Sequence, residues 1–277
     1  MFKVSIVTRS FTVAKHMLHN MLIQARPGNI LIKTSPGYRF LLKRDYSVRG
    51  PTGYPVAPWI NAVLKSQEDV DRAIEQVQAL GLPLMSDLPK NWDSLAALDF
   101  ILKNTNKRAK IFDAGAELYS VILPWLFLYG YKNLIGGNLV FDKKIRRGPI
   151  LYEYSDITRT KFKPSTLDVV VCLSVIEHGV DLSLYFKEMS RILKPNGMLI
   201  TSTDYYETPI DTKGQRAYGV PIHIFTKEEI THALCLAQEF NFVPTGPLDL
   251  ASQEKVVYWK QYDLRYSFLI FTLRKTS

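Results

Sequence analysis

The chain has 277 residues, of which 47% are hydrophobic and 22% are charged, and its formal net charge is +9. This length accommodates one large α/β domain with an extension, and the composition is ordinary for a folded protein. No apolar run reaches the roughly 20 residues of a membrane helix, and the first residues lack a secretory-signal pattern. The two cysteines, Cys172 and Cys235, argue against a disulfide framework or zinc site and favour a cytoplasmic setting.

Residues 1–60 predict a basic N-terminal extension. Residues 1–50 carry nine Lys and Arg residues against Asp45 alone, a charge that either attracts an anionic partner or is simply solvated. Within it, residues 29–46 predict a β-hairpin, because two short apolar runs flank a Ser-Pro-Gly turn. Residues 49–59 are rich in Gly and Pro and predict a linker.

Residues 61–277 predict a single domain. Ser66 is suited to cap a helix that ends at the Gly-Leu-Pro of residues 81–83, and a second helix is expected from Asp93 to Lys103. From Lys110 onward strands and helices alternate. The expected strands are KIFDA (110–114), NLIGGNLV (133–140), PILYEY (149–154), LDVVVCL (167–173), GMLITST (197–203) and RYSFLIFTL (265–273). The expected helices are 118–130, 181–193 and 226–240, the last with a capping box of Thr226 and Glu229.

This alternation predicts an α/β fold, a doubly wound and mainly parallel sheet with helices on both faces. In such sheets the ligand lies beyond the carboxyl ends of the strands, where polar and small residues collect in this chain. Small residues let backbone amides approach a ligand closely, Asn138 is suited to bond a ribose diol, and Asp156 is suited to accept from an exocyclic amine. The candidate residues are Asp113, Gly115, Ala116, Ser120, Asn138, Asp156, Ile157, Leu173 and Ser174.

Three segments of the chain resemble the class I, Rossmann-like S-adenosylmethionine-dependent methyltransferases, in particular small-molecule methyltransferases of the ubiquinone-biosynthesis type. The segments are FDAGAELYS (112–120), YSDIT (154–158) and the long block from Leu167 to Thr203, which includes the Arg-x-Leu-Lys-Pro-x-Gly signature at 191–197. The similarity extends over roughly residues 85–245.

The resemblance implies S-adenosyl-L-methionine as cofactor. It implies that Asp113, Gly115 and the nearby backbone hold the methionine end, that Asp156 and Ile157 contact adenine, and that Leu173 and Ser174 lie beside the ribose or sulfonium. The chain departs from the family where Ala116 and Glu117 replace glycines and where Asn138 replaces an acid. An amide binds a hydroxyl without charge assistance, so the cofactor is expected to bind less tightly, or not at all.

Methyl transfer to a hydroxyl needs alignment of donor and acceptor and removal of a proton. His178 and His223 are the candidate bases, and each has a packing role as its alternative. The segment from Asp204 to Ile224 is polar and aromatic, which favours a small-molecule acceptor such as a sugar. The sequence therefore predicts O-methylation of a small hydroxylated molecule.

Two alternatives remain at this stage. One is an RNA methyltransferase that docks through the basic extension, although no RNA-binding motif is present and nucleic acid is therefore an unfavoured partner. The other is a non-catalytic methyltransferase fold that serves as a binding protein. A nicotinamide dehydrogenase fits worse, because the G-x-G-x-x-G loop is missing.

Overall fold

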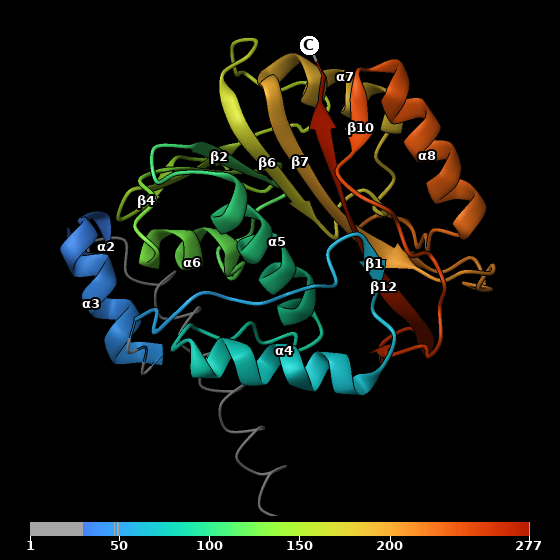
Figure 1. Ribbon diagram of the computed structural model, residues 1–277, viewed down its shortest axis with the longest axis horizontal. Helices are drawn as coiled ribbons and strands as arrows, with labels where there is room; N and C mark the ends of the chain where they lie inside the picture. The colour runs from blue at the N-terminus through green and yellow to red at the C-terminus, as the bar shows by residue number, and fades with distance from the viewer. Residues whose placement is uncertain (1–29, 47, 49, 277) are drawn as a thin grey trace, which may run out of the picture.

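A mixed β-sheet forms the centre of the structure, a computed structural model that describes residues 30–46, 48 and 50–276 (Figure 1). Five neighbouring strands run parallel, in the spatial order β7 (Leu193–Tyr205), β6 (Leu167–Leu173), β2 (Lys110–Ala114), β3 (Asn133–Asn138) and β5 (Ile150–Tyr154). Antiparallel strands flank them, with β4 (Ile145–Arg147) beside β5 and β12 (Leu264–Lys275) beside β7. The short strands β1 (Ala62–Val63), β10 (Phe242–Pro244) and β11 (Val257–Trp259) pair with β12.

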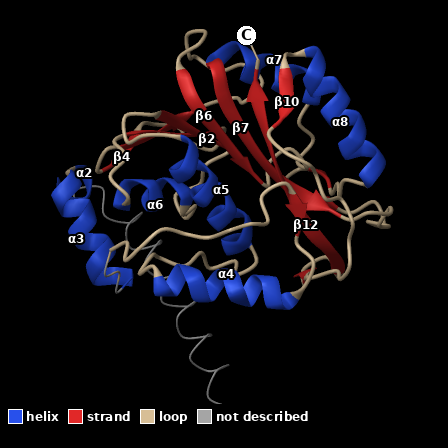
Figure 2. Ribbon diagram, viewed as in Figure 1, coloured by secondary structure: helices blue, strands red, loops and turns tan. Residues whose placement is uncertain are grey.

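Helices cover both faces of this sheet (Figure 2). On β6, Val169 and Val171 belong to one buried cluster while Val170 and Cys172 belong to the other, because successive strand side chains point to opposite faces. The first cluster includes side chains of α4 (Gln67–Ala79), α5 (Lys90–Asn104) and α6 (Ile122–Leu128). The second includes side chains of α7 (Leu182–Ile192) and α8 (Lys227–Glu239). The predicted doubly wound, Rossmann-like α/β fold is confirmed.

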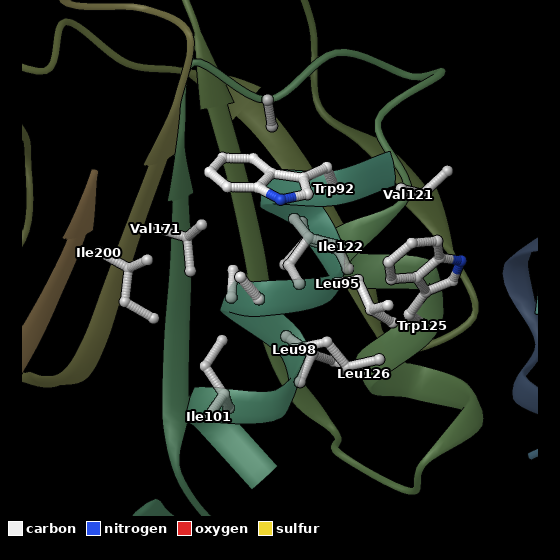
Figure 3. Packing of buried hydrophobic residues seen from close by; sticks show 14 of the residues in the cluster. Trp92, Leu95, Leu98, Ile101, Val121, Ile122, Trp125, Leu126, Val171 and Ile200 are labelled. Atoms are coloured by element: carbon white, nitrogen blue, oxygen red, sulfur yellow. The ribbon is translucent and has the colours of Figure 1, made fainter. Parts of the chain in front are cut away.

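The core beneath α5 and α6 is dominated by large apolar side chains (Figure 3). Trp92 and Trp125 are fully buried, and Leu95 of α5 lies beside Ile122 of α6 over the sheet. Each such side chain contributes roughly 1.5–3 kcal/mol on burial. This packing fixes the N-terminal end of α5 at the edge where the parallel strands end, which matters for the site described below.

Residues 30–46 form two helices, α2 (Ile30–Lys33) and α3 (Ser35–Tyr46), so the predicted hairpin is wrong. The Thr34 hydroxyl accepts from the Gly37 amide at 3.1 Å and thereby caps the first turn of α3. Pro36 is tolerated in that turn because the first helical amides lack intrahelical partners anyway. The apolar run favours a strand when the sequence is taken alone, but Tyr38, Leu41 and Leu42 are buried at a helical spacing.

The helix α3 packs against α6. The Arg39 guanidinium donates to the Phe127 carbonyl at 3.2 Å, and the Tyr38 ring stacks on the Phe127 ring at 5.5 Å. The helix therefore lies against the sheet domain, while the division of the chain at residue 60 stays a prediction.

The predicted helix caps are confirmed at both ends of the domain. Ser66 with Asp69, and Thr226 with Glu229, form complete capping boxes at the starts of α4 and α8. Within the described residues, no helix combines the length and the apolar character that crossing a bilayer demands.

The capping box of α4 yields a stability prediction. Replacing Ser66 with Ala removes the acceptor for the Asp69 amide, and the free energy of unfolding should fall by about 0.5–2 kcal/mol. Urea unfolding followed by circular dichroism measures this change. Glu75→Ala, at an exposed position of the same helix, is the control and should change stability by less than about 0.5 kcal/mol. An equal effect of both substitutions would contradict the assigned role of the cap.

Candidate functional site at the carboxyl edge of the sheet

The register of the parallel strands brings the predicted loops together. Ala114 pairs with Gly137, Asn138 with Tyr154, and Leu173 with Ser202, so β2, β3, β5, β6 and β7 end side by side. The loops that follow these strands therefore leave the sheet at one edge, as the sequence predicted. This is the edge at which open α/β sheets bind ligands.

The loop after β2 is held tightly against β3 and the loop after β6. The amides of Gly115 and Ala116 both donate to the Gly137 carbonyl, at 2.7 and 3.1 Å. Gly115 has φ +94°, and a Cβ atom there would lie 2.3 Å from Cγ2 of Val175. Ala116 is buried against β3, where a Cβ atom on Gly136 would lie only 2.9 Å from its own Cβ. Only glycine at position 115 permits this path.

Asn138 also holds the loop after β2 in place. Its amide nitrogen lies 3.1 Å from the Gly115 carbonyl and 3.2 Å from the Ala116 carbonyl, and donates to both. Its side-chain oxygen accepts from the Val140 amide at 3.2 Å. The side chain predicted to bind a ribose diol is thus engaged in shaping the loop where the cofactor was expected.

The other predicted cofactor residues have distinct surroundings. Asp156 accepts from the amide and hydroxyl of Thr158, at 2.8 and 2.7 Å, and so closes the turn after β5. Ile157 is buried in the cluster under α7 and α8, and Leu173 is half-buried at the end of β6. Ser120 accepts from the Glu117 amide at 3.0 Å and lines a concavity beside α3.

A group of charged residues, three of them buried and the fourth half-buried, lies at the ends of β6 and β7, and the sequence did not predict it. We define the buried charge cluster as Lys90, Asp93, Glu177 and Asp204. Lys90 and Asp93 come from the first turn of α5, Glu177 follows β6, and Asp204 lies at the end of β7. The three carboxylates are at most 4% exposed, which is rare for ionisable groups in a protein interior.

Hydrogen bonds hold this cluster to the strand ends. The Asp93 carboxylate accepts from the Ser202 hydroxyl at 2.6 Å, and Glu177 accepts from the Thr203 hydroxyl at 3.1 Å. The Lys90 ammonium contacts the Ser174 hydroxyl and lies 4.1 Å from the centre of the Phe268 ring. Ser174, at φ +53°, is one of the two residues, with Leu173, that are expected beside the ribose or sulfonium, so the cluster borders the predicted cofactor site.

Burial governs the protonation of this edge. Desolvation opposes the charge of Lys90, but Asp204, Asp93, Glu177 and Asp87 outweigh it, and the pKa of Lys90 is raised. Burial raises the pKa of Asp93, Glu177 and Asp204 despite the neighbouring ammonium. Burial also raises the pKa of Asp113, at the end of β2, to about 7.

Two carboxylate oxygens at this edge are suited to a positively charged ligand. Oδ2 of Asp113 and Oδ1 of Asp204 are buried and have no hydrogen-bond partner among the described residues. Buried polar atoms are normally paired, so such orphan acceptors call for an explanation. An ammonium group would donate hydrogen bonds to such oxygens, a sulfonium would offset their charge, and both groups occur in S-adenosyl-L-methionine. The residues present therefore fit this cofactor.

The two candidate bases occupy different environments. His178 is half-buried beside Asp204, and burial lowers its pKa, so the imidazole is neutral near pH 7. Its ring meets the Tyr218 ring edge-on at 5.2 Å. The side chain of His223 is 43% exposed and faces Glu229, the capping acid of α8, at 3.4 Å. Of the two, His178 lies at the buried charge cluster.

A short hairpin covers His178 on the outside. It consists of β8 (Arg216–Ala217) and β9 (Val220–Pro221), with Tyr218 and Gly219 at its tip. Tyr218 is 81% exposed, has φ +51°, and stacks on Trp259 at 6.4 Å. An exposed aromatic residue in this strained conformation is a feature that functional sites retain.

The sequence contained a signal for the missed residues. Lys90 and Asp93 open a helix whose remaining turns are strongly apolar, and Asp93 falls on its buried side. The positive end of the helix stabilises a carboxylate at that position. Sequence patterning alone did not reveal this stabilisation. The carboxyl of Glu177 joins the cluster only because β6 and β7 are adjacent in the sheet.

Comparison with known proteins gives a family match that includes part of this edge of the sheet. A family model described as a methyltransferase domain matches residues 138–201, a stretch that begins at Asn138 and therefore leaves out the Gly115 loop. No curated protein matches the sequence.

Solved structures with a similar arrangement include two S-adenosylmethionine-dependent methyltransferases. One, from Mesorhizobium loti, is 18% identical, with a TM-score of 0.46 over 66% of this chain and 97% of that one. The other, from Methanosarcina mazei, is 17% identical, with a TM-score of 0.48 over 64% and 97%. Geranyl diphosphate C-methyltransferase from Streptomyces coelicolor is 15% identical, with a TM-score of 0.49 over 86% and 98%. These similarities are too low to transfer an activity.

Residues 138–201 thus match the model of a methyltransferase domain, and they lie within a Rossmann-like α/β fold. The cofactor that this match supports is S-adenosyl-L-methionine.

The raised pKa of Asp113 makes stability depend on pH. Between its ordinary value of 3.8 and about 7, the folded state keeps a proton that the unfolded state has lost. Stability must therefore fall as the pH rises through this range, by up to about 1.4 kcal/mol per unit of pH. In Asp113→Asn this loss is absent, so the variant should gain a few kcal/mol relative to wild type between about pH 5 and about pH 8.

Urea unfolding of wild type and Asp113→Asn at these two pH values measures how the free energy of unfolding of each protein changes with pH. Subtracting one change from the other removes the contributions of other groups. Asp142→Asn, at an exposed acid beyond β3, should show the same pH dependence of stability as wild type. If Asp113→Asn and wild type respond identically to pH, the assigned environment of Asp113 is wrong.

Proposed function

We propose that this chain is an S-adenosyl-L-methionine-dependent methyltransferase that methylates a hydroxyl group of a small molecule, such as a sugar. The observation that carries the proposal is the meeting of five parallel strand ends beside two orphan buried carboxylate oxygens. The family match over residues 138–201 supports the same class of reaction.

In this proposal, the loop after β2 and Asp113 hold the methionine end of the cofactor. The ammonium of that moiety is the natural partner of Oδ2 of Asp113, which otherwise lacks one. Asp156 and Ile157 adjoin the adenine, and Leu173 and Ser174 adjoin the ribose and sulfonium. The engagement of Asn138 with the loop leaves ribose recognition to other groups, including backbone atoms.

The bound cofactor supplies an electrophilic methyl group, and the protein supplies alignment and proton removal. His178 is the proposed acceptor of the hydroxyl proton, and its neutral imidazole beside the Asp204 carboxyl supports this role. His223 remains a weaker candidate because its contacts are with Glu229 and Phe225.

The proposed acceptor surface is aromatic. His178, Tyr218 and Trp259 form a continuous set of ring contacts at the hairpin that borders the site. Aromatic faces provide apolar area, and their polar edges provide hydrogen bonds, a combination that suits the mixed surface of a sugar. These contacts support a small polyhydroxylated acceptor.

The cofactor assignment predicts measurable binding. Isothermal titration calorimetry should detect S-adenosyl-L-methionine and S-adenosylhomocysteine on the wild-type protein. Asp113→Ala should weaken binding by at least about tenfold, because a charge-assisted contact contributes roughly 1.5–3 kcal/mol. Asp99→Asn, at a buried acid that pairs with Lys103, is the control. Failure of the wild type to bind at millimolar concentration would instead favour a non-catalytic binding protein.

The acceptor assignment predicts distinct kinetic effects for two variants. With labelled cofactor and a panel of sugars and glycosides, His178→Gln should lower the rate of methyl transfer by about 100-fold or more. Tyr218→Ala should raise the KM for the acceptor while cofactor affinity is unchanged. Tyr54→Ala, at another exposed tyrosine, should do neither. Methylation of tRNA without methylation of any hydroxylated small molecule would contradict the proposal.

A further inference from the structure

The buried charge cluster carries more negative than positive charge. Its single ammonium, from Lys90, faces the three carboxyls of Asp93, Glu177 and Asp204, so complete ionisation would leave two uncompensated negative charges. Continuous burial of such charge is strongly unfavourable, and a buried group escapes the penalty by keeping its proton. The cluster is therefore built to retain protons in the absence of a further cation.

Other titratable groups interact with the cluster. They come from the turn before α5, the end of β2, the loop after β6 and the strand β12. Tyr266 and His178 both lie close enough to Asp204 to influence its pKa. The other described titratable groups that interact with the cluster are Asp87, His178, Tyr266 and, within β6, Cys172, which in turn lies near Asp113.

The position of the cluster links it to the cofactor's charge. The Lys90 ammonium contacts Ser174, the residue that borders the proposed sulfonium position, and Glu177 follows Ser174 by three residues. Oδ1 of Asp204 is buried without a partner. A fixed positive charge arriving near Ser174 would stabilise the ionised carboxyls, because interactions between charges are strong where water is excluded.

We propose that the buried charge cluster exchanges a proton for the cofactor's sulfonium charge. Glu177 and Asp204 release a proton when S-adenosyl-L-methionine binds, and they take up the acceptor's proton when the methyl group is transferred. This inference rests on the proposed function and deepens it, because it assigns a proton acceptor behind His178.

The exchange balances in atoms and charge. The acceptor oxygen forms a bond to the methyl carbon, the carbon–sulfur bond breaks, and its electron pair stays on sulfur. The hydroxyl proton passes to His178 and then to the Asp204 and Glu177 carboxyls. The sulfonium loses one positive charge and the cluster gains one proton, so the net charge of the site is unchanged.

The protonation of the free protein supports this role. Burial, the largest influence, raises the pKa of both Glu177 and Asp204, and the proximity of the two carboxyls raises that of Asp204 further. Both groups therefore hold protons in a pH range where ordinary carboxyls are fully ionised. A new cation lowers their pKa and releases the proton, while an uncharged thioether does not.

Calorimetry in two buffers of different ionisation enthalpy, phosphate and Tris, measures the protons exchanged on binding. S-adenosyl-L-methionine and S-adenosylhomocysteine are compared at about pH 7.5. We expect S-adenosyl-L-methionine, which carries the sulfonium, to release up to about one proton more than S-adenosylhomocysteine, which lacks it. The difference should disappear near pH 9, where the cluster is already ionised.

Two variants identify the source of the proton. Asp204→Asn and Glu177→Gln should each reduce the difference between the ligands, whereas Asp99→Asn, remote from the strand ends, should preserve it. Proton release from the ligand's own amino group would be the same in all variants, so it can be distinguished from proton release by the cluster. Equal release for both ligands in the wild type, or a difference that persists in both cluster variants, would overturn the inference while leaving the cofactor assignment intact. Absence of binding by either ligand would overturn the proposed function itself.

Discussion

The close approach of the β2 loop to β3 is the constraint on which the site depends. Gly115 and Ala116 share the Gly137 carbonyl as acceptor, and the Asn138 amide holds the same loop from the other side. A side chain at Gly115 would collide with Val175, and a side chain at Gly137 would lie 2.6 Å from both Phe112 and Ser155. These glycines let the strand ends lie close enough for their loops to form one surface.

The residues at the strand ends differ in charge from the rest of the buried core. Where α5 meets α6, the core is built from apolar side chains such as Trp92 and Trp125. At the strand ends, α5 instead contributes Lys90 and Asp93, which are tied to Ser174 and Ser202. Burying ionisable groups lowers stability unless they are compensated, and the proposed ligand-binding role would account for their concentration at one edge.

The sequence predicted the sheet and helices well where local signals agree with tertiary packing. The capping boxes at Ser66 and Thr226 and the apolar run of β6 are signals of that kind. Residues 30–46 were misjudged because an apolar run with a Ser-Pro-Gly segment suits both a hairpin turn and a helix start. The packing of α3 on α6, which no local pattern reveals, selects the helix. The buried charge cluster was missed for a related reason, since α5 and two strands that are distant in sequence supply it.

The central claim is that the carboxyl edge of the sheet binds the cofactor. A crystal structure of the protein grown with S-adenosylhomocysteine tests it most directly. We predict the ligand between the Gly115 loop, Asp156 and Ser174, with its ammonium within hydrogen-bonding distance of Asp113. A ligand bound elsewhere on the molecule, or Val175 still closed on Gly115 with the edge filled by protein side chains, would contradict the account.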